Sequence, residues 1–472
     1  MTDREVEPVR SEGAAGPEPG GGHPLRWRIL ALLGLGQLML ILDVTVVALA
    51  LPHIGQDLGL GREALTWTVS AYTLTFGGLM LLGGRVTDLF GSKPVVLAGL
   101  SVFTVASLSA GLGDSALTLL GGRIGQGVGA ALLSPAALSL VVTLFEGVER
   151  NRALGVWSAL GGGGAAIGVL AGGLLTAGPG WPWVFYVNVP IGVVVAVALA
   201  VLLPASARPH PRPRLDVLGA VLVTASSATL IYALVGAGDR GWVDALTAVL
   251  VGVAALGYLG FVAWQRHNAS PLMDIRLLVR RPVATGTFLI LMATVLMITV
   301  FFLGTFYFQN HHGYNAAHTG LLFLPVALAT MAGADLTGRA LASIEASRLA
   351  VAGLLVAAVG LTIPAIWLGS VPVVVGVAVA GAGTGALFVV ASATALGQVA
   401  PHEAGIASGI VSTFHEFGAS LGAAVTSSVA AASLVGTTTT GYTRGFVVAA
   451  VVAALAAIPI MVLAVRGAAD AV

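Results

Sequence analysis

The stretch Leu42-Asp-Val-Thr-Val-Val-Ala-Leu-Ala-Leu-Pro-His-Ile54 places one carboxylate, that of Asp43, in a long apolar run. The run extends over residues 29–51, which is enough for one helix across a bilayer. An acid inside such a helix costs about 2.5–3.5 kcal/mol on insertion scales and usually serves an ion or substrate pathway. We therefore expect Asp43 to face a polar cavity, the alternative being a structural tie to a neighbouring helix.

The composition predicts an all-α polytopic membrane protein. Of 472 residues, 57% are hydrophobic and only 9% are charged, whereas soluble proteins carry about 25% charged residues. The net charge of +1 argues against a nucleic-acid partner, and the absence of cysteine excludes disulfides and thiolate metal sites. Residues 1–28 are polar, contain no signal-peptide core, and are expected to form a disordered tail.

Apolar runs bounded by charged residues, Pro or Gly predict fourteen membrane spans. These lie near residues 29–51, 64–83, 94–113, 116–143, 153–176, 184–203, 216–237, 244–264, 283–307, 318–338, 349–369, 373–397, 407–433 and 444–464. The predicted domains are an N-terminal six-helix half (29–203), a linker with two inserted helices (204–264), a C-terminal six-helix half (265–464) and a short tail (465–472).

The distribution of basic residues supports this topology. With both termini in the cytoplasm, eighteen of the 22 Lys and Arg residues fall on the cytoplasmic side. Three fall outside, Arg62, Arg240 and Arg444, and Arg123 falls within a span. Because cytoplasmic loops carry the excess of basic residues, the bias predicts a multi-pass protein of the cell membrane with cytoplasmic termini.

An internal repeat relates the two halves at an offset of 256 residues. Gly125-Gln-Gly-Val-Gly-Ala-Ala in the fourth span matches Gly381-Ala-Gly-Thr-Gly-Ala-Leu in the twelfth. Two related helical halves with a site between them at mid-membrane is a common transporter plan. Chance similarity of small-residue helices is the alternative.

Three further residues inside spans are candidates for chemistry. Arg123 needs a carboxylate, carbonyl groups or water nearby, so it is either a charge partner in a proton relay or a static tie between helices. His415 and Glu416 lie about two turns into the thirteenth span. Glu416 is expected to bind a proton or a cationic substrate, or else to lie near the boundary with access to water.

The remaining sequence patterns concern turns, packing and metals. The stretch Gly83-Gly-Arg-Val-Thr-Asp-Leu-Phe-Gly-Ser-Lys93 predicts a cytoplasmic loop with a glycine turn and a lysine at the headgroups. The fifth span carries glycines on one helical face, which favours close helix packing and permits gating; these include Gly164, Gly168 and Gly172. Adjacent histidines outside the ninth span, His311 and His312, with His318, are expected to be solvated and not to bind zinc.

Together these motifs resemble the fourteen-span drug–proton antiporter family of the major facilitator superfamily, over residues 29–464. The first-span pattern runs from Leu42 to Pro52, and Arg123-Ile-Gly-Gln-Gly-Val-Gly-Ala resembles the fourth-span signature, whose arginine is implicated in proton transfer. Gly168-Val-Leu-Ala-Gly-Gly173 is similar to the antiporter signature of span five. The loop signature of the superfamily is matched by Gly84, Asp88, Gly91 and Lys93, with Leu89 and Ser92 replacing the usual arginines.

The resemblance implies a proton-coupled exporter of amphipathic or hydrophobic drugs, working by alternating access and without enzymatic activity. It implies proton-coupling roles for Asp43, Arg123 and Glu416. The residues expected to line the substrate site are Trp67, Tyr72, Gln126 and His415. A gating role is implied for the matched loop positions and for Gly164, Gly168, Gly172 and Gly173.

No cofactor is expected beyond the proton gradient, and no ATP-binding GxxxxGK[ST] motif is present. We expect a monomer whose partners are its substrate, protons and lipid. The alternative within transport is a dedicated exporter of one endogenous metabolite that gives self-resistance, in keeping with the Ala-, Gly-, Val- and Arg-rich composition of a GC-rich actinobacterium. A membrane sensor or a membrane enzyme is disfavoured, because no sizeable soluble segment and no catalytic cluster is recognisable.

Overall fold

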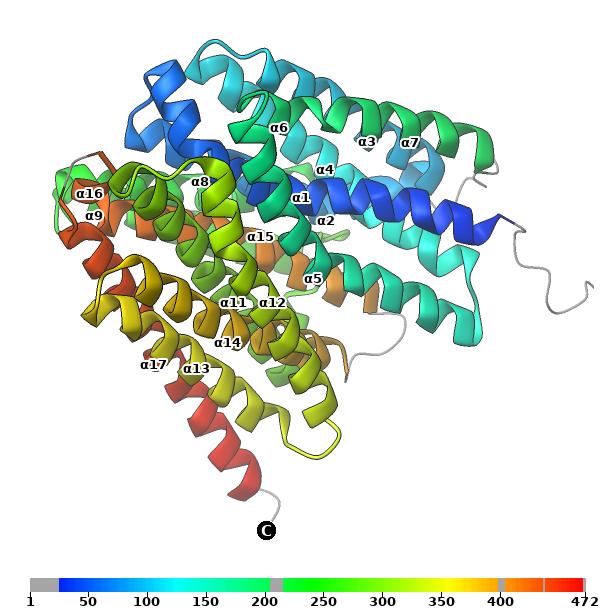
Figure 1. Ribbon diagram of the computed structural model, residues 1–472. Coiled ribbons are helices and arrows are strands. Elements are labelled where there is room, and N and C mark those ends of the chain that lie inside the picture. The colour runs from blue at the N-terminus through cyan, green and yellow to red at the C-terminus, as the bar shows by residue number, and fades with distance from the viewer. Residues whose placement is uncertain (1–24, 204–214, 398–403, 436–437, 470–472) are drawn as a thin grey trace, which may run out of the picture.

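The computed structural model describes residues 25–203, 215–397, 404–435 and 438–469, and these residues form helices without a strand (Figure 1). The first half comprises α1 (Arg26–Leu58), α2 (Arg62–Phe90), α3 (Ser92–Gly111), α4 (Ala116–Leu144), α5 (Gly147–Ala177), α6 (Trp183–Tyr186) and α7 (Asn188–Leu202). Between the halves lie α8 (Val217–Arg240), α9 (Ala245–His267) and the short α10 (Ile275–Val279). The second half comprises α11 (Arg281–Phe306), the π-helix η1 (Tyr307–His311), α12 (Ala316–Ala340), α13 (Ala346–Ile366), α14 (Ser370–Leu396), α15 (Ala404–Val429), α16 (Ala431–Val435) and α17 (Thr440–Ala469).

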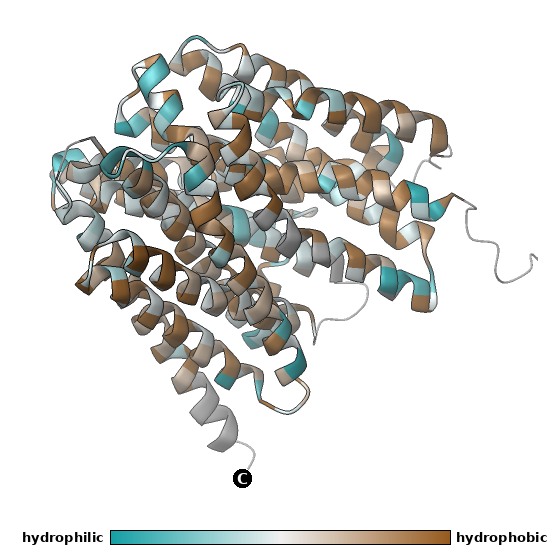
Figure 2. Cartoon of the chain, viewed as in Figure 1, coloured by the Kyte–Doolittle hydropathy of each residue, from teal (hydrophilic) through white to brown (hydrophobic). Residues whose placement is uncertain are grey.

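The helices confirm a multi-pass membrane protein. Within the described residues, twelve helices are long and apolar enough to cross a membrane. Two further long helices, α5 and α15, occupy the stretches predicted as the fifth and thirteenth spans. The count of fourteen spans is therefore not confirmed and stays a prediction. Hydrophobic residues, brown in Figure 2, predominate along the helices, as expected for a protein solvated by lipid.

The helices form two bundles with the pair α8 and α9 beside them. In Figure 1 the first bundle, blue to green, lies above the second, which runs from green through yellow to red. Helices α5 and α12 pack together across the two bundles, as do α2 and α15, and α8 contacts both α2 and α15. Residues 1–24 of the predicted tail 1–28 and residues 204–214 of the predicted linker region lie outside the described residues, so the domain boundaries stay predictions. The expectation of disorder is wrong for Arg26 to Arg28, which form the first turn of α1. Helix α17 continues through Ala469, into the stretch predicted as a tail.

The prediction of a loop over residues 83–93, between the second and third spans, is wrong. Helix α2 continues through Gly84 and Asp88 to Phe90, and α3 begins at Ser92, so only Gly91 interrupts the helix. Gly91 has φ +90°, a conformation that glycine adopts without steric penalty. The Lys93 ammonium donates to the carbonyl oxygens of Ala200 (2.9 Å) and Leu203 at the end of α7, where unpaired carbonyls favour a cation.

The repeat between the halves is present, but its register differs from the predicted one. A Cβ on Gly129 of α4 would lie 2.5 Å from Phe103 N on α3, and one on Gly383 of α14 would lie 2.6 Å from Ala357 N on α13. Both pairs are therefore related by 254 residues, not 256. In each half the fourth helix packs against the second and third helices through glycines that let backbones approach closely.

The glycine face of α5 packs mainly within its own half. A Cβ added at Gly164 would lie 2.8 Å from Ile41, one at Gly168 would lie 1.9 Å from Thr45 Oγ1, and one at Gly172 would lie 2.8 Å from Val46 Cα, all on α1. Gly173 instead meets the Ala316 carbonyl oxygen of α12, at 2.7 Å. The predicted packing role is therefore seen in the structure, while the gating role of this face stays a prediction.

Candidate functional site

The centre of the first half contains a buried ion pair between Asp43 of α1 and Arg123 of α4. Nη1 of Arg123 donates to Oδ2 of Asp43, and neither side chain is accessible to solvent. The sequence placed both residues inside spans, and the structure brings them into direct contact. Because two charges in a low-dielectric interior are stable only when paired and hydrogen-bonded, this pair depends on the polar groups around it.

Two amide side chains complete the coordination of the Asp43 carboxylate. Nε2 of Gln126 donates to Oδ1 of Asp43 at 2.8 Å, while Oε1 of Gln126 accepts from Nη1 of Arg123 at 2.8 Å. Nδ2 of Asn188, at the start of α7, donates to the same Oδ1 at 3.3 Å. The Ser107 hydroxyl of α3 accepts from Gln126 Nε2 at 2.8 Å and from Asn188 Nδ2 at 3.5 Å. Four helices thus supply one polar cluster, comprising Asp43, Arg123, Gln126, Asn188 and Ser107.

The Arg123 guanidinium is held by α2 as well as by Asp43. Its Nε donates to the Thr68 carbonyl oxygen at 2.7 Å, and its Cζ lies 4.4 Å from the centroid of the Tyr72 ring. The Tyr72 hydroxyl donates to the Leu40 carbonyl oxygen at 3.3 Å, which fixes the ring on which the guanidinium packs. Nη2 of Arg123 is buried without a hydrogen-bond partner among the described residues. One buried donor therefore remains available in an otherwise satisfied cluster.

The backbone of α4 explains how Arg123 and Gln126 reach this position. They lie three residues apart, which places both on one face of the helix. Gly127 follows directly, and a Cβ there would lie 2.8 Å from the Tyr72 carbonyl oxygen of α2. The missing side chain lets α4 approach α2 closely, which brings the guanidinium within reach of Thr68 and Tyr72.

Glu416 and His415 lie in the second half, apart from the polar cluster. Glu416 of α15 is 8% exposed and packs against α2, where a Cβ on Gly77 would lie 2.7 Å from Glu416 Cβ. The carboxylate forms no hydrogen bond or ion pair within the part of the chain that the structure describes. His415 faces another way: its Nδ1 lies 3.0 Å from Thr294 Oγ1 of α11, and its ring packs on Phe388 of α14.

The remaining predicted substrate residue, Trp67, lies outside the polar cluster. Its half-buried ring packs with Ile231, Val235 and Ala424, on the side of α2 that faces α8 and α15. Of the four residues expected to line a substrate site, only Tyr72 and Gln126 are therefore close to Asp43. The histidines near α12 pack on tyrosine rings, with His311 stacked on Tyr307 and His318 stacked on Tyr314.

Sequence reasoning missed three contributors to polar contacts. Asn188 stands in the stretch Phe-Tyr-Val-Asn-Val-Pro, and an amide at the start of an apolar span is a signal that could have been used. Ser107 carries no such signal, since isolated serines are common in apolar helices. Arg62 was assigned to an outer loop, but it lies in the first turn of α2, 7% exposed, and donates to Ser427 and to the Val235 carbonyl oxygen.

Comparison with known sequences supports a transporter. The sequence is 36% identical to the puromycin resistance protein pur8 of Streptomyces alboniger, over 94% of this chain and 87% of that one. It is 36% identical to the cephamycin export protein CmcT of Amycolatopsis lactamdurans, over 84% and 83% of the two chains. It is 33% identical to the multidrug resistance protein Stp of Mycobacterium tuberculosis, over 85% and 76%.

Comparison with solved structures supports the same fold. The crystal structure of the POT family transporter PepTSo aligns with a TM-score of 0.65 at 14% identity, over 93% of this chain and 98% of that one. A bacterial homologue of the lysosomal transporter Spinster, inward-facing and unoccupied, aligns with a TM-score of 0.63 at 16% identity, over 93% and 96%. The profile of the Major Facilitator Superfamily matches residues 33–422. The chain therefore belongs to the major facilitator superfamily, a family of membrane transporters and not of enzymes.

Proposed function

We propose that the protein exports small amphipathic or hydrophobic drugs and antibiotics across the cytoplasmic membrane, driven by protons that move inward. The observation that carries the proposal is the buried Asp43–Arg123 ion pair with its amide partners in the first half. Support for the cargo comes from pur8, CmcT and Stp, whose names describe antibiotic resistance, export and multidrug resistance.

In the proposed mechanism, Asp43 is the group that takes up and releases the proton. In the charged state the carboxylate accepts from Arg123, Gln126 and Asn188. Protonation of Asp43 removes the negative charge that balances Arg123. The guanidinium then needs other acceptors, and its Nη2 is a donor that has none in the charged state. Because the cluster joins α1, α4, α7 and α3, a change in these bonds alters how the helices of the first half pack.

The contacts between the halves support an arrangement that is closed at one end of the molecule. Gln309 Nε2 of η1 donates to the Leu49 carbonyl oxygen of α1 at 2.9 Å, and Arg62 donates to Ser427 at 2.9 Å. Gly173 of α5 meets Ala316 of α12 at the same end. With both termini in the cytoplasm, as the basic residues predict, this end is the outer one, and the proposed state is inward-facing.

Glu416 is a second candidate proton site in this proposal. It lies on the seam between α2 and α15, which belong to different halves, and it has no bonded partner among the described residues. A carboxylate at this seam is placed to respond to relative movement of the halves. The two acids are distinguished by removing each charge separately.

The test is transport by the purified protein in sealed proteoliposomes with an imposed proton gradient. We compare the wild type with Asp43→Asn, Glu416→Gln and the control Asp335→Asn, whose carboxylate forms an exposed ion pair with Arg339 on α12. The panel contains puromycin as well as cationic and neutral compounds. We expect Asp43→Asn to lose gradient-driven uptake by 100-fold or more, roughly the scale of removing a group essential to one step, while Asp335→Asn keeps it. Unchanged proton-coupled transport in Asp43→Asn would contradict the assignment, and transport that persists without a gradient would contradict proton coupling.

A second candidate function is a dedicated exporter of one endogenous metabolite that gives self-resistance. It is favoured by the names of two relatives, each of which specifies one antibiotic. Both candidates share the mechanism above and differ in breadth. Transport of one compound of the panel and of no other would favour the dedicated exporter, whereas transport of several unrelated compounds would favour multidrug efflux.

A further inference from the structure

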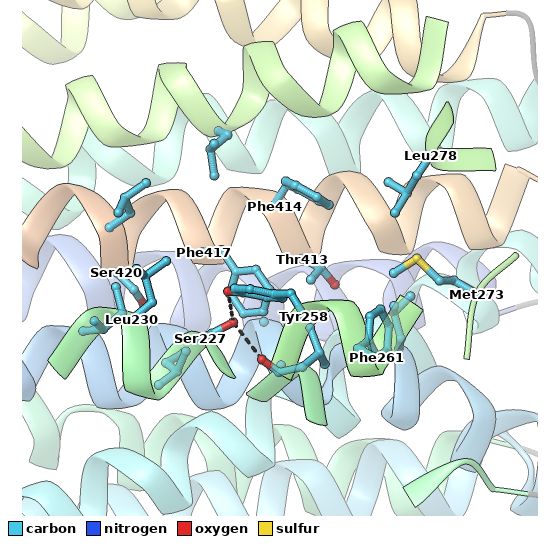
Figure 3. A pocket seen from close by; sticks show the side chains of 18 of the residues that line it. Ser227, Leu230, Tyr258, Phe261, Met273, Leu278, Thr413, Phe414, Phe417 and Ser420 are labelled. Atoms are coloured by element: carbon cyan, nitrogen blue, oxygen red, sulfur yellow. Dashed lines mark hydrogen bonds between the residues drawn. The ribbon is translucent and has the colours of Figure 1, made fainter. Parts of the chain in front are cut away.

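A pocket of about 320 Å³ lies between the inserted helices and the seam of the two halves (Figure 3). Its walls come from α2, α8, α9 and α15, with Leu291 of α11, and the segment from Met273 to Leu278 contributes at one end. No residue of the polar cluster around Asp43 lines it. The pocket is therefore separate from the polar cluster around Asp43, whereas Glu416 adjoins it at Gly77.

The lining of the pocket is neutral and rich in aromatic rings. Among its lining residues there is no Asp, Glu, Lys, Arg or His, while Tyr258, Phe261, Phe414 and Phe417 contribute rings from α9 and α15. Small-molecule sites are mostly apolar concave surfaces with a few fixed polar groups. Glu416 lies behind the wall at Gly77 and does not itself line the pocket. Because a charged ligand would lose its hydration without touching a counter-charge, the lining favours uncharged molecules.

Two hydroxyl groups supply the fixed polar component. Thr413 of α15 is 3% exposed, and its Oγ1 has no hydrogen-bond partner in the described part of the chain. Figure 3 shows its oxygen on the side of the α15 backbone that faces Tyr258 and Phe261 of α9. The Ser227 hydroxyl donates to the Val223 carbonyl oxygen at 2.8 Å and lies 2.7 Å from the Tyr258 hydroxyl, which therefore donates to Ser227 and keeps its own lone pairs free. The pocket thus offers one hydrogen-bond donor and one acceptor.

The walls of the pocket are fixed by hydrogen bonds outside it. Nη2 of Arg85 on α2 donates to the Pro271 carbonyl oxygen at 3.0 Å, and Oε1 of Gln265 accepts from the Met273 backbone N–H at 3.4 Å. On α8, Asp216 accepts from Trp264 Nε1 of α9 at 2.8 Å. The hairpin of α8 and α9 and the segment after it are therefore tied to each other and to α2, so a ligand meets a preformed cavity.

We propose that this pocket is a second binding site, for an uncharged amphipathic small molecule with an apolar chain or ring system and one hydroxyl, carbonyl or amide group. The apolar part lies among the rings of Tyr258, Phe261, Phe414 and Phe417, and the polar group bonds to the hydroxyls of Thr413 and Tyr258. The ligand is a small molecule dissolved in the bilayer and not a phospholipid chain. The site does not depend on proton coupling at Asp43.

The test is photolabelling of the full-length protein in lipid nanodiscs with 3-azioctanol, an uncharged alcohol with a diazirine on its chain, followed by mapping of the adducts by mass spectrometry. We expect saturable adducts on Tyr258, Phe261 and the 413–417 segment that unlabelled octanol displaces and tetraphenylphosphonium does not. Adducts confined to lipid-facing residues such as Leu256 of α9, which is 68% exposed, would overturn the proposal.

Matched variants distinguish loss of labelling caused by a change in the pocket from loss caused by misfolding. Thr413→Val combined with Tyr258→Phe removes both hydroxyls at nearly constant volume and should raise the half-saturating concentration about 30-fold, the scale of two neutral hydrogen bonds. Thr305→Val makes the same change at another buried, unpartnered hydroxyl on α11 and should leave labelling unchanged. Val262→Trp fills the pocket from α9 and should abolish the saturable adducts. Labelling that survives Val262→Trp would overturn the proposal.

Two further experiments distinguish a small-molecule ligand from a phospholipid chain, and this pocket from the proton site at Asp43. A phospholipid with a diazirine in its acyl chain should label Leu256 and spare Tyr258. If it labels the pocket and octanol does not displace it, the small-molecule assignment is wrong. Asp43→Asn should leave 3-azioctanol labelling unchanged whether or not it abolishes transport, so failure of the proton site and failure of this pocket give different results.

Discussion

The Arg62 guanidinium donates a hydrogen bond to the Ser427 hydroxyl across 2.9 Å, and it joins the first turn of α2 to the last turn of α15. Its Nη2 also donates to the Val235 carbonyl oxygen of α8 at 3.0 Å and pairs with Asp239. One buried cation therefore holds the first half, the second half and the inserted helices at one end of the molecule. Any movement that separates the halves at this end must break these bonds.

We expect Arg62→Ala to open this end of the molecule. Hydrogen bonds to a charged group contribute about 1.5–3 kcal/mol, so the ratio of open to closed molecules should rise roughly 10-fold or more. The chain contains no cysteine, so spin labels can be placed at exposed positions such as Glu63 of α2 and His318 of α12 without removing native thiols. Electron–electron distance measurements should then show a larger population at long distance.

Arg240→Ala serves as the control for this prediction. Arg240 lies near the same end, where it forms a partly exposed pair with Asp244 at 3.8 Å and lies over the Tyr232 ring, within the inserted helices and their connection. Its removal should leave the distance distribution unchanged, since such pairs contribute little. Equal distributions in Arg62→Ala and the wild type would show that the bonds of Arg62 do not hold the halves together.

Arg123→Lys is expected to abolish transport although it keeps the positive charge. Arginine uses Nε and Nη1 to reach Thr68, Asp43 and Gln126 at once, and a single ammonium cannot reproduce this planar arrangement. Breaking a buried pair costs about 3–5 kcal/mol, and the lysine recovers only part of it. Thermal unfolding should therefore shift downward, and gradient-driven uptake should fall by about 100-fold. Near-wild-type uptake would mean that charge alone suffices.

Asn188→Leu is expected to lower transport more than stability. The amide donates to Asp43 at 3.3 Å and to Ser107 at 3.5 Å, two long hydrogen bonds worth about 1 kcal/mol together. Because the Asp43 carboxylate loses the donor that joins it to α7, gradient-driven uptake should fall about fivefold. Initial uptake rates at a fixed gradient measure this effect. A lower unfolding temperature with unchanged uptake would indicate a purely structural role for Asn188.

Gly168→Ala should destabilise the protein, whereas Gly155→Ala on the same helix should not. A Cβ at Gly168 would lie 1.9 Å from Thr45 Oγ1, while one at Gly155 meets nothing within 4 Å. Overpacking costs about 1–3 kcal/mol, and replacing an exposed helical glycine by alanine gains up to about 1 kcal/mol. Thermal unfolding of both variants, and of Gly168→Ala combined with Thr45→Ala, measures the contact. Rescue by Thr45→Ala is expected, and equal melting of the two single variants would exclude the predicted clash.

The sequence predicts the helices well because lipid makes apolar length the dominant signal. Predicted span ends differ from helix ends where polar residues continue the helix, as at Arg85 and Asp88 of α2, since backbone hydrogen bonding of the helix extends beyond the apolar run. For the same reason the prediction of a loop after the second span was wrong. The turn there is made by Gly91 alone, through its positive φ.

The centre of the site was predictable only in part. The contact between Asp43 and Arg123 could be expected, because a buried charge is stabilised when an opposite charge lies within reach. The positions of Trp67 and Glu416 could not, because apolar periodicity does not say which neighbour a helix face meets. Ser107 and Asn188 come from helices far from Asp43 in sequence, so only tertiary packing shows their role.

The close fit of α2 beneath α8 has a consequence for how this architecture could lose or gain helices. Gly78 has no side chain, and α8 approaches so closely that a Cβ there would lie 2.3 Å from Thr224 Oγ1. Deleting the hairpin would expose the backbone at Gly78 to acyl chains and leave a groove that lipid fills poorly. The hairpin is thus a built-in substitute for annular lipid beside α2, and a shortened chain would need a larger residue at position 78 to remain well solvated.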